Sequence, residues 1–474
     1  MSDAVFEFVI VGAGPAGEAA AYEARRRGAS VAIVDRGWFG GSCPHVGCIP
    51  SKSLLDSAAR HAANPASWSW RQASERRDWM VNRPTDAPEP DDRSHVEALE
   101  EAGATCYRGT GRIAARGQVE VRHDDQVHVL HARHVVVAVG SRSRLPAVAG
   151  IDDVPVWTNR DATLARELPA RLLVLGGGPT GVELAQVYAR FGVPVAIVQS
   201  GDRLAPTDHP RNSAVIAEAL RADGVDVRLG VKAVAVEVRG GRDGAHLVRL
   251  SDGSSAEGHA ILLAVGREFP LEDLGLEAYG IDLSGRTAFP RDGRLRLAEG
   301  LWVVGDPAGP ELHTHQAHYQ GETAIRMALG DPIAPDYRAL PRVTYTDPEA
   351  AFVGLSLEGA RDTGVDAFEL VADFATSARG YGVQAARGHV TIVVDRATGT
   401  LCGAAMACPD ASAAIHECVL AIQARVPIAI LAETIHAFPS TPRILNGLFA
   451  DARRELARSG AAGARREWLG PTQR

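Results

Sequence analysis

One kind of segment occurs twice in this chain and restricts its fold more than any other feature. Residues 8 to 35 read FVIVGAGPAGEAAAYEARRRGASVAIVD, and residues 172 to 199 read LLVLGGGPTGVELAQVYARFGVPVAIVQ. Each copy has an apolar run, a G-x-G-x-x-G turn, an alanine-rich helical stretch and a second apolar run. One such turn is weak evidence, but two copies with matched spacing predict two Rossmann-type units that bind dinucleotides.

The three glycines of each turn have different expected roles. The first turns the chain, the second lets a pyrophosphate approach the backbone, and the third packs the helix on the strand. The helix N-terminus then faces the phosphates. The candidate cofactor-binding glycines are Gly12, Gly14 and Gly17 in the first unit and Gly176, Gly178 and Gly181 in the second. The alternative is two glycine-rich turns that bind nothing.

The residue that ends the second strand distinguishes the two sites. Asp35 offers a carboxylate to ribose hydroxyls, so the first site suits a dinucleotide without a 2′-phosphate, such as FAD. Gln199 is neutral at the equivalent place and does not repel a 2′-phosphate, although no arginine follows it directly. The second site is therefore interpreted as NADPH or NADH, with a slight preference for NADPH.

Three further apolar runs end on glycine, where backbone crowds a ligand or turns sharply. They are HVVVAVGSRSRLP with Gly140, AILLAVGREFP with Gly266 and Arg267, and LWVVGDPAG with Asp306. Asp306 is placed to accept from the ribityl chain of a flavin or to cap the next helix. We expect a nucleotide-binding domain in residues 1–149 and 266–337, interrupted by a second one in residues 150–265. Residues 60–95 are expected to be an irregular surface insertion near the substrate entrance, and residues 338–474 an α+β domain with a hairpin turn at Ala397–Gly399.

Composition limits the partners. The chain of 474 residues has a net charge of -8, which argues against nucleic acid or an anionic membrane as a partner. No apolar run is long enough to span a membrane, and the N-terminus has no signal-peptide pattern, so a cytoplasmic protein is expected. Only Lys52 and Lys232 are lysines among 50 basic residues.

Two cysteines stand five residues apart in GGSCPHVGCIPSK (40–52). Cys43 and Cys48 have too few neighbouring ligands for a structural zinc site, and a reducing cytosol disfavours a purely structural disulfide. Pro44 and Gly47 prevent a regular helix, in which the two sulfurs would diverge. A reversible dithiol beside the FAD site is the preferred interpretation.

This segment resembles the redox signature of the class I pyridine nucleotide–disulfide oxidoreductases, which include glutathione reductase, dihydrolipoamide dehydrogenase and mercuric reductase. AVGSRSRLP, LWVVGDPAG and YTDPEAAFVG are similar to the family's later motifs. The resemblance implies two Rossmann-like domains, a C-terminal α+β dimerisation domain, and a homodimer whose subunits share each active site. It also implies that Cys48 faces the flavin, that Cys43 is the interchange thiol, and that Lys52 pairs with Glu183 where hydride arrives.

The family's C-terminal acid–base pair is missing from TIHAFPSTPRIL (434–445). Alignment on Pro439 puts Phe438 in place of the histidine that protonates the leaving thiol, and Arg443 in place of the glutamate that orients it. His436 matches a second, non-catalytic histidine of dihydrolipoamide dehydrogenases. The chain is therefore predicted to be neither a glutathione reductase nor a dihydrolipoamide dehydrogenase.

Two relatives lack that histidine. One is mercuric reductase, but no counterpart of its C-terminal cysteine pair or of its N-terminal metal-binding domain is expected from this sequence. 2-Ketopropyl-coenzyme M oxidoreductase/carboxylase carries phenylalanine there and GGSCPH at its redox motif, which makes His45 a candidate electrostatic stabiliser. His45 could equally be a loop histidine bonded to backbone, and no coenzyme M site can be mapped.

The predicted function is an FAD enzyme that takes hydride from NAD(P)H and passes electrons through Cys43–Cys48 to a non-standard acceptor. Candidate acceptors are a thioether or disulfide, a metal ion and a quinone; the alternative is an electron relay to a protein partner. His315 matches a common family position beside the flavin, and no metal site is predicted at His313, His315 and His318. Cys106, Cys402, Cys408 and Cys418 are expected to be small buried hydrophobes.

Overall fold

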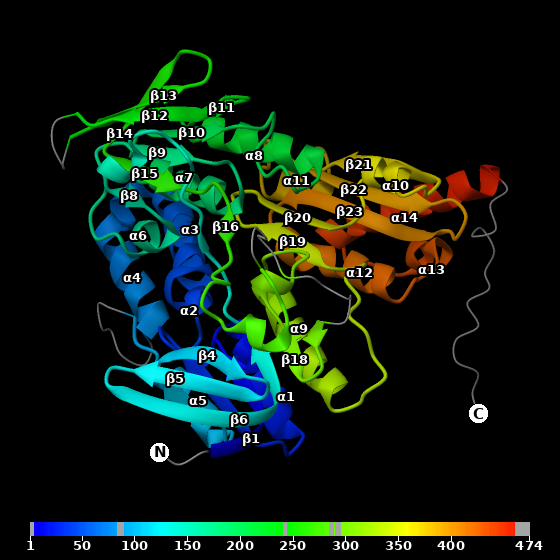
Figure 1. Cartoon of the computed structure of the whole chain (residues 1–474). Helices are drawn as coiled ribbons and strands as arrows, with labels where there is room; N and C mark the ends of the chain where they lie inside the picture. The colour runs from blue at the N-terminus through cyan, green and yellow to red at the C-terminus, as the bar shows by residue number, and fades with distance from the viewer. Residues whose placement is uncertain (1–3, 83–89, 240–243, 284–288, 290–294, 460–474) are drawn as a thin grey trace, which may run out of the picture.

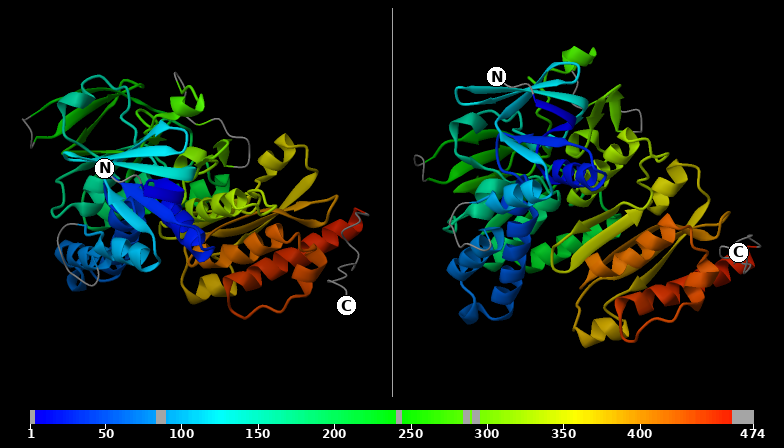
Figure 2. Two further views of the ribbon diagram at one scale, coloured as in Figure 1. Left: turned by 60° about the horizontal axis from the view of Figure 1, so that its bottom comes forward. Right: turned by 90° about the horizontal axis from the view of Figure 1, so that it is seen from below.

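The computed structural model describes residues 4–82, 90–239, 244–283, 289 and 295–459. Three large sheets, of eight, five and five strands, organise this part of the chain. In Figure 1 the first lies at the bottom, the second at the upper left and the third at the right, and in both views of Figure 2 the third stays apart from the other two. The predicted α/β class with two Rossmann-like units and a C-terminal α+β domain is confirmed.

The first sheet is a Rossmann sheet formed by two separate segments of the chain, residues 4–137 and residues 296–303. Its strands run in the order β17-β18-β6-β1-β2-β3, with β4 and β5 forming an antiparallel extension on β6. The pairs β1–β2 and β1–β6 are parallel, as a βαβ unit requires. The elements are β1 Ala4–Val11, α1 Pro15–Arg26, β2 Val31–Asp35, β3 Thr105–Arg108, β4 Thr110–Ala115, β5 Gln118–His123, β6 Gln126–Val137, η3 Leu276–Tyr279, β17 Arg296–Ala298, β18 Leu301–Val303, η4 Asp306–Ala308 and α9 Thr314–Ala328.

Helices α1 and α9 pack closely, and the middle of α9 lies against the first half of α1. A Cβ on Gly321 of α9 would lie 2.3 Å from the carbonyl oxygen of Ala16 in α1. Glycine at this position therefore allows the two backbones to touch. Residues far apart in the chain thereby meet at one edge of the sheet.

The second sheet repeats the first in smaller form. Its strands run β11-β10-β9-β15-β8, all parallel, and a three-stranded antiparallel sheet β12-β13-β14 covers one side. Two segments of the chain connect this unit to the first sheet, and the short antiparallel strands β7 and β16 pair these segments with each other. The elements are β7 Arg142–Ser143, η2 Ile151–Asp153, β8 Val156–Trp157, α6 Asn159–Leu164, β9 Leu172–Leu175, α7 Pro179–Arg190, β10 Val195–Gln199, α8 Pro210–Ala222, β11 Asp226–Leu229, β12 Ala233–Glu237, β13 His246–Leu250, β14 Ser255–Gly258, β15 Ala260–Leu263 and β16 Arg267–Glu268.

The expectation of an irregular insertion over residues 60–95 was wrong for most of that segment. The chain forms α2 Ser42–Val46, α3 Cys48–Ala63, η1 Pro65–Ser67, α4 Trp70–Asn82 and α5 Arg93–Glu101. Trp70 is buried against Tyr188 and Phe191 of the second sheet's region, with ring centroids 5.3 and 5.1 Å away. The prolines and tryptophans that indicated a loop in fact flank and anchor a helix; residues 83–89 lie outside the described residues.

The third sheet is antiparallel, in the order β19-β20-β23-β22-β21, with helices α12 and α14 packed against it. The predicted turn at Ala397–Gly399 joins β22 to β23, and the N–H of Gly399 donates to the carbonyl of Asp395. Cys408 and Cys418 are buried in its core, whereas Cys106 and Cys402 are only partly buried. The elements are β19 Pro341–Thr344, β20 Glu349–Gly354, α10 Leu357–Asp362, β21 Ala367–Asp373, α11 Ala378–Gly382, β22 His389–Asp395, β23 Thr400–Cys408, α12 Ala411–Gln423, α13 Ile428–Glu433 and α14 Thr441–Arg458.

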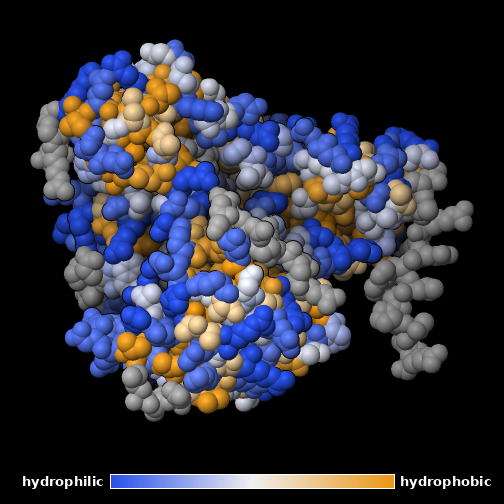
Figure 3. All heavy atoms as spheres, viewed as in Figure 1, coloured by the Kyte–Doolittle hydropathy of each residue, from blue (hydrophilic) through white to orange (hydrophobic). Residues whose placement is uncertain are grey.

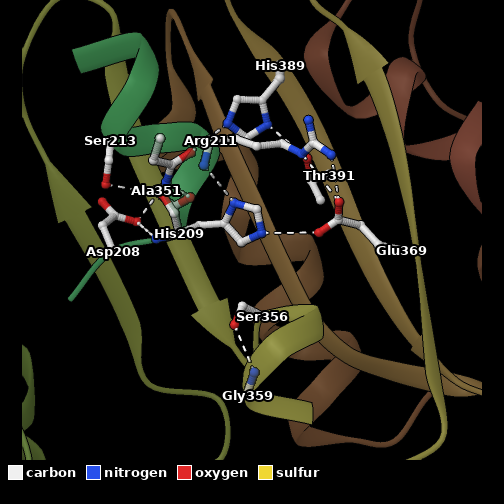
Figure 4. A network of polar contacts seen from close by, with 11 residues as sticks. Asp208, His209, Arg211, Ser213, Ala351, Ser356, Gly359, Glu369, His389 and Thr391 are labelled. Carbon is white, nitrogen blue, oxygen red and sulfur yellow. Dashed lines mark hydrogen bonds and ion pairs between the residues drawn. The ribbon is translucent and has the colours of Figure 1, made fainter. Parts of the chain in front are cut away.

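A buried polar network joins the second and third sheets at the start of α8 (Figure 4). Asn212 donates to Asp208 at 2.8 Å and to the carbonyl of Ala351 at 2.9 Å, and its amide oxygen lies 2.8 Å from Nε2 of His389. His209 lies 3.3 Å from Glu369. The unit built around the second sheet is thus attached to the third sheet by directional contacts.

Hydrophilic and hydrophobic residues are interspersed over the face shown in Figure 3. In the part of the chain that the structure describes, no helix is long and apolar enough to cross a membrane.

Candidate active site

The two glycine turns have nearly identical geometry. A Cβ on Gly12 would lie 2.3 Å from the carbonyl oxygen of Ala138, and one on Gly176 would lie 2.2 Å from that of Ala264. A Cβ on the third glycine would lie 1.9 Å (Gly17) or 2.2 Å (Gly181) from the carbonyl oxygen of the first. These four positions therefore admit no side chain.

The middle glycine of each turn faces open space instead. A Cβ on Gly14 would approach nothing closer than the Cα of Gly41 at 3.9 Å, and one on Gly178 would meet nothing within 4 Å. Each is the N-cap of its helix, α1 or α7, and neither helix has a side-chain cap. An open space before uncapped backbone N–H groups suits a pyrophosphate, so both turns fit a dinucleotide.

The strand-end residues hold their turns in the same way but differ in charge. Asp35 accepts from the N–H of Ala13 and from that of Gly37, both at 2.7 Å. Gln199 accepts from the N–H of Gly177 at 2.9 Å through Oε1. Because a backbone N–H can only donate, the Gln199 amide oxygen must face the turn and its NH₂ group must point away from it. The first site thus offers carboxylate oxygens, and the second offers a neutral donor.

Asp306 lies where the two nucleotide-binding regions meet. Its Oδ2 accepts from the hydroxyl of Ser141, directly after Gly140, and lies 3.8 Å from Nε of Arg267. Arg267 also donates to the Ser141 carbonyl at 2.7 Å. Asp306 begins η4, and its side chain therefore contacts both the loop that follows β6, through Ser141, and the start of β16, through Arg267.

The dithiol sits between two helices that Gly47 brings together. Cys43 lies in α2 and Cys48 is the first residue of α3. A Cβ on Gly47 would lie 2.9 Å from the Ser42 carbonyl oxygen and 3.1 Å from the Cys43 Cα, so a larger residue would push the helices apart. Both cysteines are free thiols that are partly buried.

The two thiols have opposite pKa shifts. The hydrogen bond from Cys43 lowers the pKa of Cys48 to about 6, and Thr314 and the charge of Lys52 act in the same direction. The same hydrogen bond and burial raise the pKa of Cys43. Cys48 is therefore the thiolate at neutral pH, and Cys43 is the proton-bearing partner.

Thr314 is a contact of both sulfurs that the sequence did not reveal. Its Oγ1 donates to Sγ of Cys43 at 3.2 Å and lies 3.5 Å from Sγ of Cys48. The residue begins α9, which the packing of α9 on α1 carries to the dithiol. Nothing in the spacing of LHTHQ relates Thr314 to cysteines more than 260 residues earlier.

Lys52 and Glu183 form an ion pair between α3 and α7. Nζ of Lys52 lies 2.8 Å from Oε2 of Glu183, and the Lys52 side chain is 34% exposed against 6% for Glu183. Burial alone would lower the pKa of Lys52, but the attraction and hydrogen bond of Glu183 outweigh it and raise the pKa. Lys52 lies one turn after Cys48 on the same helix face.

His45 lies apart from the chemistry suggested for it. Its side chain is 1% exposed, Nε2 lies 2.8 Å from the Phe39 carbonyl oxygen, and the ring contacts Trp38 and His95. Burial lowers the pKa of His45, so it is neutral at pH 7. This geometry fits the backbone-bonded alternative and gives no support to an electrostatic stabiliser.

The loop between α13 and α14, residues 434–440, is called the C-terminal loop below, and it presents Phe438 without an acid–base partner. The Phe438 side chain is 72% exposed. Arg443 donates to the side chain of Asn446 on α14. Both nitrogens of His436 are engaged: Nε2 lies 2.7 Å from Glu417 of α12, and Nδ1 lies 2.9 Å from the Thr434 carbonyl. The Glu417 contact was not indicated by the sequence.

The two histidines at the start of α9 contact each other, and one of them is bonded to the backbone, while the buried Nε2 of His313 has no hydrogen-bond partner among the described residues. His313 and His315 stack with ring centroids 5.1 Å apart, and Nε2 of His315 lies 2.9 Å from the Pro341 carbonyl. Burial lowers the pKa of both. Within the part of the chain that the structure describes, no group of three or more His, Cys, Asp or Glu side chains could hold a metal ion.

Comparisons with known proteins agree with this geometry. The family model described as pyridine nucleotide-disulphide oxidoreductase matches residues 6–321, and the model of its dimerisation domain matches residues 340–446. Dihydrolipoyl dehydrogenase of Geobacillus stearothermophilus is 31% identical over 460 residues, which cover 92% of this chain and 94% of the relative. The corresponding enzyme of Thermus scotoductus is 31% identical over 451 residues, covering 92% and 95%.

Two solved structures extend the comparison. The Cu(II) complex of the HOCl-induced flavoprotein disulfide reductase RclA from Escherichia coli, in a cysteine-to-serine variant, superposes with a TM-score of 0.85 at 26% identity, covering 94% of this chain and 99% of that one. LpdA from Mycobacterium tuberculosis superposes with a TM-score of 0.83 at 28% identity, covering 95% and 99%.

Proposed function

The chain belongs to the pyridine nucleotide-disulphide oxidoreductase family, and on that premise we propose that it reduces an acceptor needing no histidine acid. It is a flavoprotein oxidoreductase that uses FAD and NAD(P)H, and it carries the family's dimerisation domain.

The glycine turns, the ion pair and the two thiols have different proposed roles. The turns at Gly14 and Gly178 would hold the pyrophosphates of FAD and NAD(P)H, and the bound flavin supplies two-electron transfer between nicotinamide and dithiol. Lys52 and Glu183 place a fixed ion pair on the nicotinamide side. Cys48, with a pKa of about 6, remains a thiolate at neutral pH, whereas Cys43 keeps its proton and is the thiol that meets the acceptor.

One observation carries the proposal: the C-terminal loop and the first turn of α14 have no group able to deliver a proton. Phe438 has no ionisable group, and both nitrogens of His436 are bonded within the chain. Arg443 cannot give up a proton near neutral pH. In a dimer whose subunits share each site, this loop would border the partner's Cys43. A thiolate leaving group would then depart without a general acid, which is typically worth about 10²–10⁴ in rate.

Reduction of oxidised lipoamide and of oxidised glutathione needs such protonation. We therefore expect this chain to differ in its acceptor from the relatives named dihydrolipoyl dehydrogenase. Reduction of a metal ion does not need such protonation. Two Cu(II) ions take one electron each from the dithiol, which becomes the Cys43–Cys48 disulfide, and the thiol proton is released to solvent. The Cu(II) complexes of a similar flavoprotein favour a metal ion as the first acceptor to test.

An acceptor panel tests this proposal. Anaerobic NAD(P)H oxidation by the holoenzyme is followed with Cu(II), a water-soluble quinone, lipoamide and oxidised glutathione, each with Cys43→Ser as the control. We expect saturable turnover with Cu(II) or with the quinone, and we expect Cys43→Ser to abolish that turnover. Turnover with the two disulfides should be at least about 10²-fold slower. Fast lipoamide turnover that depends on Cys43 would refute the proposal; turnover only with a protein oxidant would favour a relay.

A further inference from the structure

The ion pair of Lys52 and Glu183 has a third partner, which comes from the dimerisation domain. The backbone N–H of Tyr345 donates to Oε1 of Glu183 at 2.9 Å. The ring of the same residue lies 4.6 Å from Nζ of Lys52, measured to the ring centroid. Tyr345 stands in the turn between β19 and β20, so a single residue contacts both members of a pair that joins α3 to α7.

This turn is fixed by the helix that carries Glu183. Gln186 of α7 is fully buried, and its Oε1 accepts from the N–H of Asp347 at 2.7 Å while its Nε2 donates to the Asp347 carbonyl at 3.1 Å. Arg190 lies 2.9 Å from the Asp347 carboxylate. Glu183, Gln186 and Arg190 are spaced three and four residues apart and share one face of the helix. The position of Tyr345 relative to Glu183 is therefore set by several bonds.

The contacts of Lys52 indicate what the ring contributes. Its ammonium has three N–H donors and gives one to Glu183 at 2.8 Å and a long one to Ser51 at 3.4 Å. The negative face of an aromatic ring attracts a cation within about 6 Å of its centroid. A lysine side chain is a flexible four-carbon stem, so one short and one long hydrogen bond leave the direction of its ammonium poorly defined. The Tyr345 ring restricts that freedom.

We propose that Tyr345 is a positioning residue for hydride transfer, which holds the Lys52 ammonium and the Glu183 carboxylate in one arrangement. The inference rests on the role proposed above for this ion pair. Tyr345 makes and breaks no covalent bond: the hydride carries both electrons from nicotinamide to flavin. The dimerisation domain thereby contributes to the half of the reaction that involves NAD(P)H as well as to the acceptor side.

The chain offers an unusually clean readout because it has only two lysines, Lys52 and the exposed Lys232. Acylation of both by an amine-selective reagent, quantified by mass spectrometry, gives the reactivity of Lys52 with Lys232 as an internal reference. Tyr345→Leu is expected to raise the Lys52/Lys232 ratio at least about threefold, and Tyr345→Phe, which keeps the ring, to restore protection. Tyr381→Leu, the same change at a 78% exposed tyrosine of this domain, is the control. An unchanged ratio in Tyr345→Leu would overturn the inference.

A second measurement addresses the reaction itself. Flavin reduction by NAD(P)H is followed by stopped flow in the holoenzyme, without any acceptor. Tyr345→Leu is expected to lower the limiting rate about 3- to 30-fold with little change in nucleotide Kd, the range expected for a lost cation–π contact. In the Lys52→Met background the same substitution should add nothing. An equal loss in both backgrounds would show that Tyr345 acts only as a structural contact and would contradict the inference.

The two proposals fail separately. Fast disulfide turnover in the acceptor panel would refute the proposed acceptor class and leave the Tyr345 result intact. A Lys52→Met variant that reduces flavin at the wild-type rate would refute the role of the ion pair. Loss in Lys52→Met without loss in Tyr345→Leu would refute the Tyr345 inference alone.

Discussion

Nε2 of His436 and Oε1 of Glu417 lie 2.7 Å apart, so the histidine of the C-terminal loop is paired with a carboxylate of α12. The second nitrogen of His436 bonds the Thr434 carbonyl at 2.9 Å, and the side chain is only 6% exposed. The pair resembles a base and its orienting carboxylate but has no nitrogen left for a substrate. The pair therefore has the geometry of a structural contact that holds the C-terminal loop against α12.

We therefore expect His436→Gln to leave acceptor turnover within about threefold of the wild type, because loss of a true general acid costs about 10²–10⁴. The measurement is steady-state NAD(P)H oxidation with the acceptor identified by the panel. Glu417→Gln serves as the matched control, since it retains a hydrogen bond to the ring. A 10²-fold loss confined to His436→Gln would show that this histidine supplies a proton.

The opposite pKa shifts of the thiols predict their alkylation. In the reduced holoenzyme, modification of Cys48 by iodoacetamide should follow a titration with a midpoint near pH 6, while Cys43 stays unreactive across neutral pH. Thr314→Val removes a hydroxyl 3.5 Å from Cys48 and should move the midpoint to higher pH. Thr363→Val, on the exposed surface, is the control. A midpoint at the ordinary thiol value in the wild type would contradict the assignment of Cys48 as thiolate.

The orientation of the Gln199 amide predicts a nucleotide preference. Its NH₂ group faces away from the glycine turn, and no carboxylate repels a 2′-phosphate, so NADPH should be the better donor. Gln199→Glu keeps an acceptor for the Gly177 N–H and adds a negative charge. The ratio of kcat/KM for NADPH over NADH should fall by about tenfold or more. A ratio that does not change would show that Gln199 does not border the 2′ position.

Burial raises the pKa of Asp208 from 3.8 to about 6 in the network of Figure 4. A carboxyl whose pKa is higher in the folded state binds protons more tightly there, so stability is lost as pH rises through this window. Asp208→Asn keeps an oxygen for Asn212 and the His209 N–H and removes the charge. The free energy of unfolding of the variant, relative to that of the wild type, should be about 1 kcal/mol higher at pH 8 than at pH 5. Thermal unfolding at the two pH values measures this, with Asp366→Asn at the surface as the control; an equal gain at both would contradict it.

Local signals in the sequence predict the scaffold because their physical causes are local. The glycine turns, with Asp35 and Gln199, follow from backbone geometry within one βαβ unit. Cys43 and Cys48 are predicted for the same reason, since Gly47 between them permits the close approach.

The remaining contacts depend on tertiary packing that no spacing encodes. Thr314 reaches the dithiol because Gly321 lets α9 touch α1, and Tyr345 reaches Lys52 because α7 holds the turn after β19. Residues 60–95 mislead for the same reason: their prolines and tryptophans indicate a loop, but the packing of Trp70 on distant residues stabilises a helix.

The direct test of the central claim is turnover of lipoamide and oxidised glutathione by the wild type and by the Phe438→His/Arg443→Glu variant, at equal flavin content. The wild type should turn over both disulfides slowly, because a departing thiolate finds no proton donor beside Phe438. The double variant should be faster by about tenfold or more, with reduced activity toward the native acceptor. Wild-type turnover of either disulfide at tens per second, with no gain in the variant, would contradict the claim that this enzyme works without the acid.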